Sequence, residues 1–93
     1  MDLGKAIKTI RKKRGLKQKE LANFCGISTN AMLSIEANKS FPHKTTIRKI
    51  CEVLDIPVAY LLFFCITDED IPEKSKYLFN LLYEPIRKLL LKE

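Results

Sequence analysis

Cysteine, histidine and glycine are scarce in this 93-residue sequence, and tryptophan is absent. The three cysteines, Cys25, Cys51 and Cys65, share no short spacing that would bind zinc or form a redox pair, so we expect reduced thiols in a core. The single histidine, His43, has no second ligand or nucleophile beside it. Paired carboxylates and a phosphate-binding glycine loop are lacking as well. These absences predict a protein that is not an enzyme and that has no metal or cofactor.

Long apolar runs are also missing. The longest, residues 58–66, is far too short to cross a bilayer. Met1 is followed by a mixed polar and apolar sequence rather than by a basic start and an apolar core, so we expect no signal peptide. We therefore expect a cytoplasmic protein with no membrane contact.

Charge and hydrophobicity are what the sequence has in quantity. Hydrophobic residues make up 46% and charged residues 30% of the chain, which is ordinary for a folded protein. The length suits one domain with a tail rather than two independent cores. The net charge of +6 attracts polyanions, and DNA and RNA are the usual partners of such a field.

Apolar residues recur at helical spacing through the first two thirds of the chain, and no segment there alternates with a period of two. The pattern predicts helices over about residues 3–14, 18–25, 28–37, 47–54 and 57–64. Gly26 supplies the positive φ that a tight turn needs, Ser28 is a good N-cap, and Asn38 suits a left-handed helix end. An all-α fold of five helices is expected.

A C-terminal segment, residues 67–93, begins with an acidic patch, Asp68 to Asp70, after which apolar residues again recur at helical spacing. Pro85 interrupts the pattern. Because a proline inside a helix removes a hydrogen bond and clashes with the preceding turn, we expect a kink or two short helices there. The chain thus divides into a domain, residues 1–66, and a helical tail, residues 67–93.

The most specific motif lies at residues 15–28, GLKQKELANFCGIS, and is followed by Ile35 and Glu36. It resembles the lambda-repressor-like (Cro/CI, XRE-type) helix-turn-helix family of transcriptional regulators. The resemblance covers roughly residues 3–64 and rests on Gln18, on Ala22 and on Gly26 in the turn. It implies a five-helix DNA-binding domain whose third helix enters the major groove of double-stranded DNA, and a regulator, with repression favoured over activation.

The resemblance also assigns the DNA contacts by position. Thr29, Asn30 and Ser34 would contact base edges, since Met32 and Ile35 can point inward together. Asn30 can pair with adenine through its amide. No arginine lies on this helix, so the bidentate contact to guanine is not available from it, and we expect modest sequence discrimination with a large share from phosphates and DNA shape.

Backbone contacts are expected from five further residues, on the same resemblance: Lys17, Gln18, Lys39, His43 and Lys44. Lys17 departs from the family, which prefers a small capping residue there. A lysine forgoes a cap and puts a cation at the positive end of a helix, so either a DNA phosphate lies beside it or it is simply solvated. Arg11 and Glu36 match a pair that ties the first helix to the end of the third, and we expect a structural salt bridge.

An apolar surplus at the end of the fifth helix and in the tail predicts a homodimer, since such a surface on a small domain is usually buried. The residues that would form the dimer contact are Phe63, Phe64, Leu78, Leu82 and Leu89. The alternative is that the tail folds back over residues 61–66 of its own chain.

Two rival functions remain open from the sequence. An antitoxin or a restriction-modification controller would carry the same motif and use its tail to bind a partner protein. RNA binding would need exposed aromatic residues, and we expect the phenylalanines to be buried.

Overall fold

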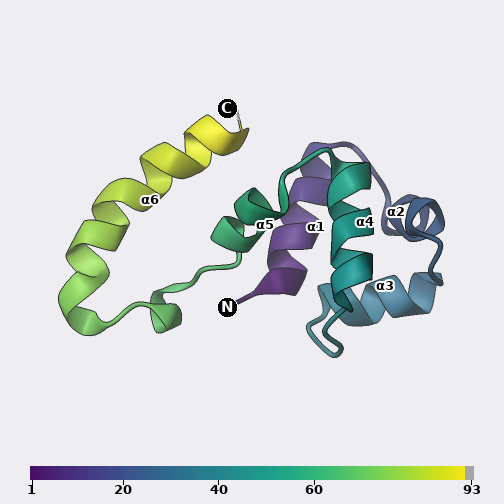
Figure 1. Ribbon diagram of the computed structural model, residues 1–93, viewed down its shortest axis with the longest axis horizontal. Helices are drawn as coiled ribbons and strands as arrows, with labels where there is room; N and C mark the ends of the chain where they lie inside the picture. The colour runs from purple at the N-terminus through teal and green to yellow at the C-terminus, as the bar shows by residue number, and fades with distance from the viewer. Residues whose placement is uncertain (92–93) are drawn as a thin grey trace.

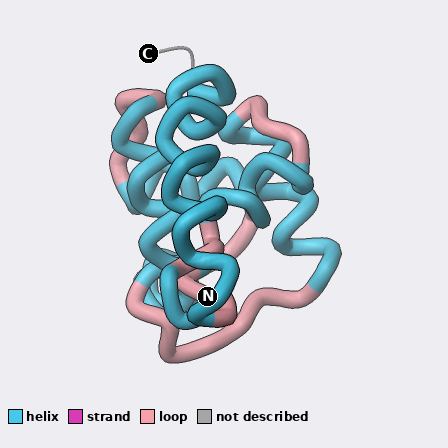
Figure 2. The backbone as a smooth tube through the Cα atoms, turned by 90° about the vertical axis from the view of Figure 1, so that its left-hand side faces the viewer, coloured by secondary structure: helices cyan, strands magenta, loops and turns pink. Residues whose placement is uncertain are grey.

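The computed structural model describes residues 1–91 and contains only helices and loops in that range (Figures 1 and 2). The helices are α1 (Leu3–Lys13), α2 (Gln18–Cys25), α3 (Thr29–Glu36), α4 (Lys44–Leu54), α5 (Val58–Phe64), two short 3₁₀ turns η1 (Asp68–Asp70) and η2 (Glu73–Ser75), and α6 (Lys76–Leu91). This confirms the all-α prediction of five helices and a helical extension. The last two residues of the predicted tail, 92 and 93, lie outside the described range.

The boundaries of the central helices follow from local signals. Ser28 caps α3, because its hydroxyl oxygen accepts the backbone N–H of Ala31 at 3.0 Å. Gly26 has φ 71° between α2 and α3, and Asn38 has φ 59° just beyond the end of α3. These three expectations are confirmed, and together they fix the length and the mutual angle of the two helices.

One core joins the first five helices. Its members are the apolar side chains that face inward from each: Leu3, Ala6, Ile7, Ile10, Leu21, Ala22, Met32, Ile35, Ile50, Cys51, Leu54, Ile56, Leu61 and Cys65. Among residues 1–91, the tail contributes only Leu91 to this cluster. Since burying a leucine or isoleucine side chain is worth about 1.5–3 kcal/mol, helices α1 to α5 carry nearly all of the stabilising burial.

At Gly4, helix α1 comes so close to the end of α3 that no side chain would fit between them. A Cβ atom at Gly4 would lie 2.5 Å from the carbonyl oxygen of Glu36 and 2.7 Å from that of Ile35. The Gly4 backbone N–H donates to the side-chain oxygen of Asn38 at 2.9 Å. Gly4 therefore sets the distance between α1 and the C-terminal end of α3.

Of the two outcomes expected at Pro85, a kink or two short helices, the second is wrong, because α6 (Lys76–Leu91) is one helix that contains the proline. Helix α6 passes through Pro85, and this residue is exposed. Proline removes the N–H that would bond the carbonyl of Leu81, but water can reach an exposed carbonyl and replace that bond. In Figure 1, α6 lies at one end of the long axis of the molecule, and α2 and α3 lie toward the other end.

Two phenylalanines depart from the sequence-based expectation. Phe24 on α2 and Phe41 in the loop before α4 are exposed, whereas burial was expected for all of them. Phe24 lies on the outer side of α2, and Phe41 lines an open, mostly apolar groove with Ile47, Val58 and Leu62, so neither ring is buried. The argument against RNA binding that rested on buried phenylalanines therefore fails for these two residues.

Candidate nucleic-acid interface

Helices α2 and α3 pack against each other, and we call this pair of helices the bracket. The side of the bracket that faces the core is apolar. Met32 and Ile35 on α3 are buried, and Leu21 and Ala22 on α2 are buried against them and the rest of the core. Ala22 is small, and a small side chain lets two helices joined by a short turn approach closely. Burial of one side of α3 leaves its opposite side facing solvent.

The outer side of α3 carries the residues that the sequence assigned to base contacts. Thr29 and Asn30 are exposed, and Ser34 is half-buried one turn later. The same side presents Leu33, whose side chain is 54% exposed. Leu33 is not among the residues that the sequence assigned to DNA contacts. The sequence contained a signal for this placement. Leu33 lies three residues after Asn30, and residues three and four apart share a helix face.

A buried ion pair joins α1 to the end of α3. The Arg11 guanidinium donates to both carboxylate oxygens of Glu36, at 2.8 Å from Nε and 3.0 Å from Nη2. A third N–H of Arg11 donates to the carbonyl of Leu16 at 2.8 Å. The Gln18 amide also donates to Glu36, at 3.1 Å. The structure thus places Gln18, expected at a phosphate, in this network at the start of α2.

A second set of bonds holds the same end of α3, just beyond Glu36. The Asn38 amide donates to the Asp2 carboxylate at 2.7 Å, and the same carboxylate oxygen accepts the backbone N–H of Lys5, which caps α1. The bond from Asn38 is the main reason that the pKa of Asp2 is lowered, and the bond from Lys5 adds to it. With the Gly4 contact, these bonds fix α3 against α1 at the residue where the helix ends.

Three exposed lysines and the histidine lie beside this bracket. Lys17, Lys39, His43 and Lys44 are all exposed, at the start of α2, after α3 and at the start of α4. Neither Lys17 nor His43 caps its helix through its side chain. The backbone N–H of Lys17 instead donates to the Glu20 carboxylate at 2.8 Å. The first N–H groups of both helices have no partner within the helix and remain suited to an anion.

Burial affects all three thiols. Burial raises the pKa of the Cys65 thiol to about 11, and it raises the pKa of Cys51 and of Cys25 as well. Cys51 and Cys65 are buried, whereas Cys25 is half-buried at the end of α2. Within residues 1–91, no group of three or more metal-binding side chains comes together.

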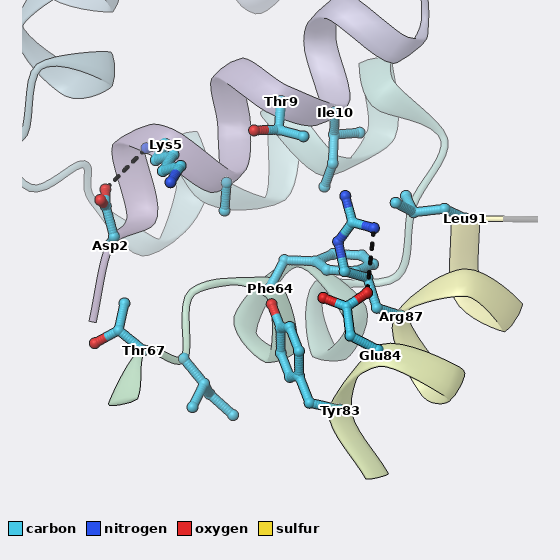
Figure 3. Close-up of a pocket in the computed structure, with 12 residues that line it drawn as sticks. Asp2, Lys5, Thr9, Ile10, Phe64, Thr67, Tyr83, Glu84, Arg87 and Leu91 are labelled. Atoms are coloured by element: carbon cyan, nitrogen blue, oxygen red, sulfur yellow. Dashed lines mark hydrogen bonds and ion pairs between the residues drawn. The ribbon is translucent and has the colours of Figure 1, made fainter. Parts of the chain in front are cut away.

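The tail touches the domain along one edge. The Phe63 ring of α5 stacks on Tyr83 of α6 with centroids 5.1 Å apart, and Phe79 lies 5.0 Å from Tyr83 on the other side. A cavity of about 390 Å³ separates α6 from α1, with Thr9 and Ile10 on one side and Arg87 and Leu91 on the other (Figure 3). The tail therefore leans on α5 and encloses a hollow rather than packing closely.

The five residues expected at a dimer contact fall into two groups. Phe63 and Phe64 are half-buried, and both contact other parts of the same chain. Leu78, Leu82 and Leu89 of α6 are exposed. Leu81 and Ile86 are exposed beside them. We call these five exposed side chains of α6 the leucine face.

No helix within residues 1–91 is both long enough and apolar enough to cross a membrane. The geometry described so far is a basic, two-helix bracket with an exposed polar strip on its second helix.

Comparison with known proteins identifies this arrangement. The helix-turn-helix family model matches residues 7–61, which is more than half of the chain. The chain is 32% identical over 85 residues to the transcriptional repressor RstR of the cryptic phage CTXphi from Vibrio cholerae, covering 90% of this chain and 77% of the repressor. It is also 32% identical over 88 residues to a putative helix-turn-helix-type transcriptional regulatory protein of Methanocaldococcus jannaschii, covering 92% of this chain but 28% of that protein.

Two solved structures share the fold. The clp gene regulator ClgR from Corynebacterium glutamicum superposes with a TM-score of 0.71 at 20% identity, over 92% of each chain. A chain of the SinR protein/SinI protein complex superposes with a TM-score of 0.64 at 27% identity, over 95% of this chain and 90% of that one.

The chain belongs to the helix-turn-helix family. A DNA-binding transcriptional regulator is the class of protein that this family and fold define.

Proposed function

We propose that the chain is a cytoplasmic, non-enzymatic repressor that binds a specific sequence in double-stranded DNA as a homodimer. The outer side of α3 enters the major groove, with Thr29, Asn30 and Ser34 at base edges. The observation that carries the proposal is the exposure of Thr29 and Asn30 on a helix whose opposite side is fully buried. The similarity to a phage transcriptional repressor favours repression over activation.

The rigidity of α3 supports base recognition. The Arg11–Glu36 pair and the Asp2–Asn38 bond both fix the C-terminal end of the helix relative to α1. A reader of base edges must hold its side chains to a fraction of an ångström, and a helix fixed at two places does so without ordering on binding.

The side chains of Thr29, Asn30 and Ser34 limit how well α3 can distinguish one base pair from another. The Asn30 amide can donate to and accept from adenine, whereas the hydroxyls of Thr29 and Ser34 can meet several base edges. Lys17, Lys39, His43 and Lys44 would contact phosphates, with Gln18 contributing through the part of its amide that Glu36 does not occupy. Most of the affinity then comes from phosphate contacts, and it falls steeply as salt is added.

The homodimer matches an operator that consists of two symmetry-related half-sites. Two copies of α3 must lie about 34 Å apart to reach successive major grooves on one side of the duplex. The leucine face offers apolar side chains spaced four and seven residues apart, at 78, 82 and 89, which is the spacing of a helix that pairs with another helix. Phe63 and Phe64 would support α6 from within each chain.

The experiment is selection of bound duplexes from a random pool, followed by a salt titration on the selected operator. The Asn30→Ala variant should lose preference at one base pair in each half-site, at a cost of about 1–3 kcal/mol. Asn80→Ala, an exposed asparagine of α6, is the matched control and should select the same sequence as the unchanged protein. Unaltered sequence preference in Asn30→Ala would refute the assignment of α3.

A second function, in which the tail binds a different protein, is favoured by one observation. The fold matches a chain of the SinR protein/SinI protein complex over 95% of this chain, so the match includes most of the tail. An antitoxin or a restriction-modification controller would use the leucine face in this way. Purification from the native host separates the two: a single species of twice the chain mass supports the homodimer, and a second polypeptide in the same peak supports the alternative.

A further inference from the structure

An exposed leucine interrupts the polar strip of α3. Leu33 is 54% exposed, whereas the other large apolar residues of the helix, Met32 and Ile35, are 0% and 5% exposed. Leu33 lies three residues after Asn30 and four after Thr29, so it occupies the same face one turn further along. Its side chain is therefore not required to complete the core.

The place of Leu33 determines what could cover it. The helix that carries it is fixed to α1 through Glu36 and Asn38, so Leu33 cannot turn inward without breaking those bonds. The tail lies toward the other end of the molecule (Figure 1), and no part of α6 reaches this face. Under the proposed function, the surface that meets this side of α3 is the major groove.

The largest apolar group along the base edges of the major groove is the C5-methyl of thymine, in whose place cytosine has only a hydrogen atom. A leucine offers no hydrogen bond, so opposite any other edge it would remove a polar base atom from water without replacing its bond. We propose that Leu33 is a specificity-determining residue that contacts a thymine methyl next to the base pair contacted by Asn30. This inference rests on the proposed function and deepens it, because it assigns adjacent A·T pairs to each half-site.

The test removes the methyl group and nothing else. Each thymidine of the selected operator is replaced in turn by deoxyuridine, and the dissociation constant is measured for the unchanged protein and for Leu33→Ala. We expect one position in each half-site at which the unchanged protein loses about fourfold, because one buried methyl is worth about 0.8 kcal/mol and 1.4 kcal/mol is a tenfold change. Leu33→Ala should bind the thymidine operator more weakly and should lose less than about 1.5-fold on the same replacement.

Two control variants test whether the response to deoxyuridine depends on an apolar side chain at position 33. Leu33→Met retains an apolar side chain of similar volume and should keep most of the response to deoxyuridine. Leu62→Ala removes a leucine that is 43% exposed on α5 and should respond as the unchanged protein does. Because Leu33 is exposed, its replacement by alanine should leave the thermal unfolding midpoint nearly unchanged, which circular dichroism verifies.

The outcomes separate the two proposals. Equal losses for Leu33→Ala and the unchanged protein at every thymine, or an operator in which no thymine responds, would overturn the role of Leu33 while leaving base recognition by α3 intact. A protein that selects no sequence from the pool would overturn both.

Discussion

The Arg11 guanidinium and the Glu36 carboxylate share two hydrogen bonds of 2.8 and 3.0 Å, and their side chains are 9% and 3% exposed. Two charges that are so nearly removed from water depend on each other, because each one alone would keep its desolvation cost without its partner. The pair therefore couples the position of α3 to that of α1.

Loss of one member of this pair should be costly. Arg11→Met leaves the Glu36 carboxylate with only the Gln18 amide, and we expect the free energy of unfolding to fall by about 3–5 kcal/mol in urea denaturation. Arg11→Met with Glu36→Met should lose less than Arg11→Met alone. The exposed pair between Lys76 and Glu73 is the control, and Lys76→Met should cost less than about 1 kcal/mol. A double variant that lost the sum of both single changes would contradict the coupling.

Gly4→Ala should also destabilise the protein. Alanine is the better helix former by about 1 kcal/mol, but its Cβ would lie 2.5 and 2.7 Å from two backbone carbonyl oxygens, which cannot rotate away. We expect a net loss of about 1–3 kcal/mol, measured by urea denaturation, together with weaker DNA binding because the end of α3 must move. Lys8→Ala, at an exposed position of the same helix, should change stability by less than about 0.5 kcal/mol. An unchanged Gly4→Ala protein would show that α1 and α3 are further apart than described.

Lys17→Ser separates a phosphate contact from a solvated lysine. Serine restores the missing N-cap of α2 and should raise stability by about 1 kcal/mol. If Lys17 contacts a phosphate, the same change should weaken binding to all sequences and reduce the slope of log K against log salt by about 0.9. Lys74→Ser, an exposed lysine of η2, should leave the slope as it was. A steep, unaltered slope in Lys17→Ser would leave this lysine with no role at the backbone.

The leucine face should hold two copies together. Leu78→Glu with Leu82→Glu places two carboxylates on it, and we expect light scattering to change from twice the chain mass to the chain mass. Affinity for a palindrome should fall by about 100-fold because the second half-site loses its effective concentration, whereas affinity for a single half-site should stay the same. Asn80→Glu adds a charge on another side of the same helix and should remain dimeric. An unchanged protein that is monomeric at high concentration would refute the dimer.

The parts of the fold that the sequence predicted are those with local causes. Ser28, Gly26 and Asn38 each act on the backbone within a few residues of themselves, so their effects on α2 and α3 could be derived without knowing the tertiary packing. The pairing of Arg11 with Glu36 crosses 25 residues, and only the family resemblance pointed to it.

The parts that the sequence did not predict depend on packing over long distances. Nothing near Phe24 or Phe41 in the sequence reveals that their side chains are left exposed. The stacking of Tyr83 on Phe63 joins residues that no local pattern relates, and α6 contains the exposed Pro85 without dividing into the two short helices that were one of the two expected outcomes. Contacts of Thr29, Asn30 and Ser34 with bases remain predictions that the experiments above test.

The separation between tail and core has a consequence for control of the protein. Within residues 1–91, α6 gives the core only Leu91, and neither Arg11 nor Asn38 depends on it. A competitor that captured α6 would therefore leave each domain folded and able to recognise its half-site. Such an antagonist would raise the protein concentration needed for half-occupancy of an operator. The base sequence that the protein recognises would stay the same.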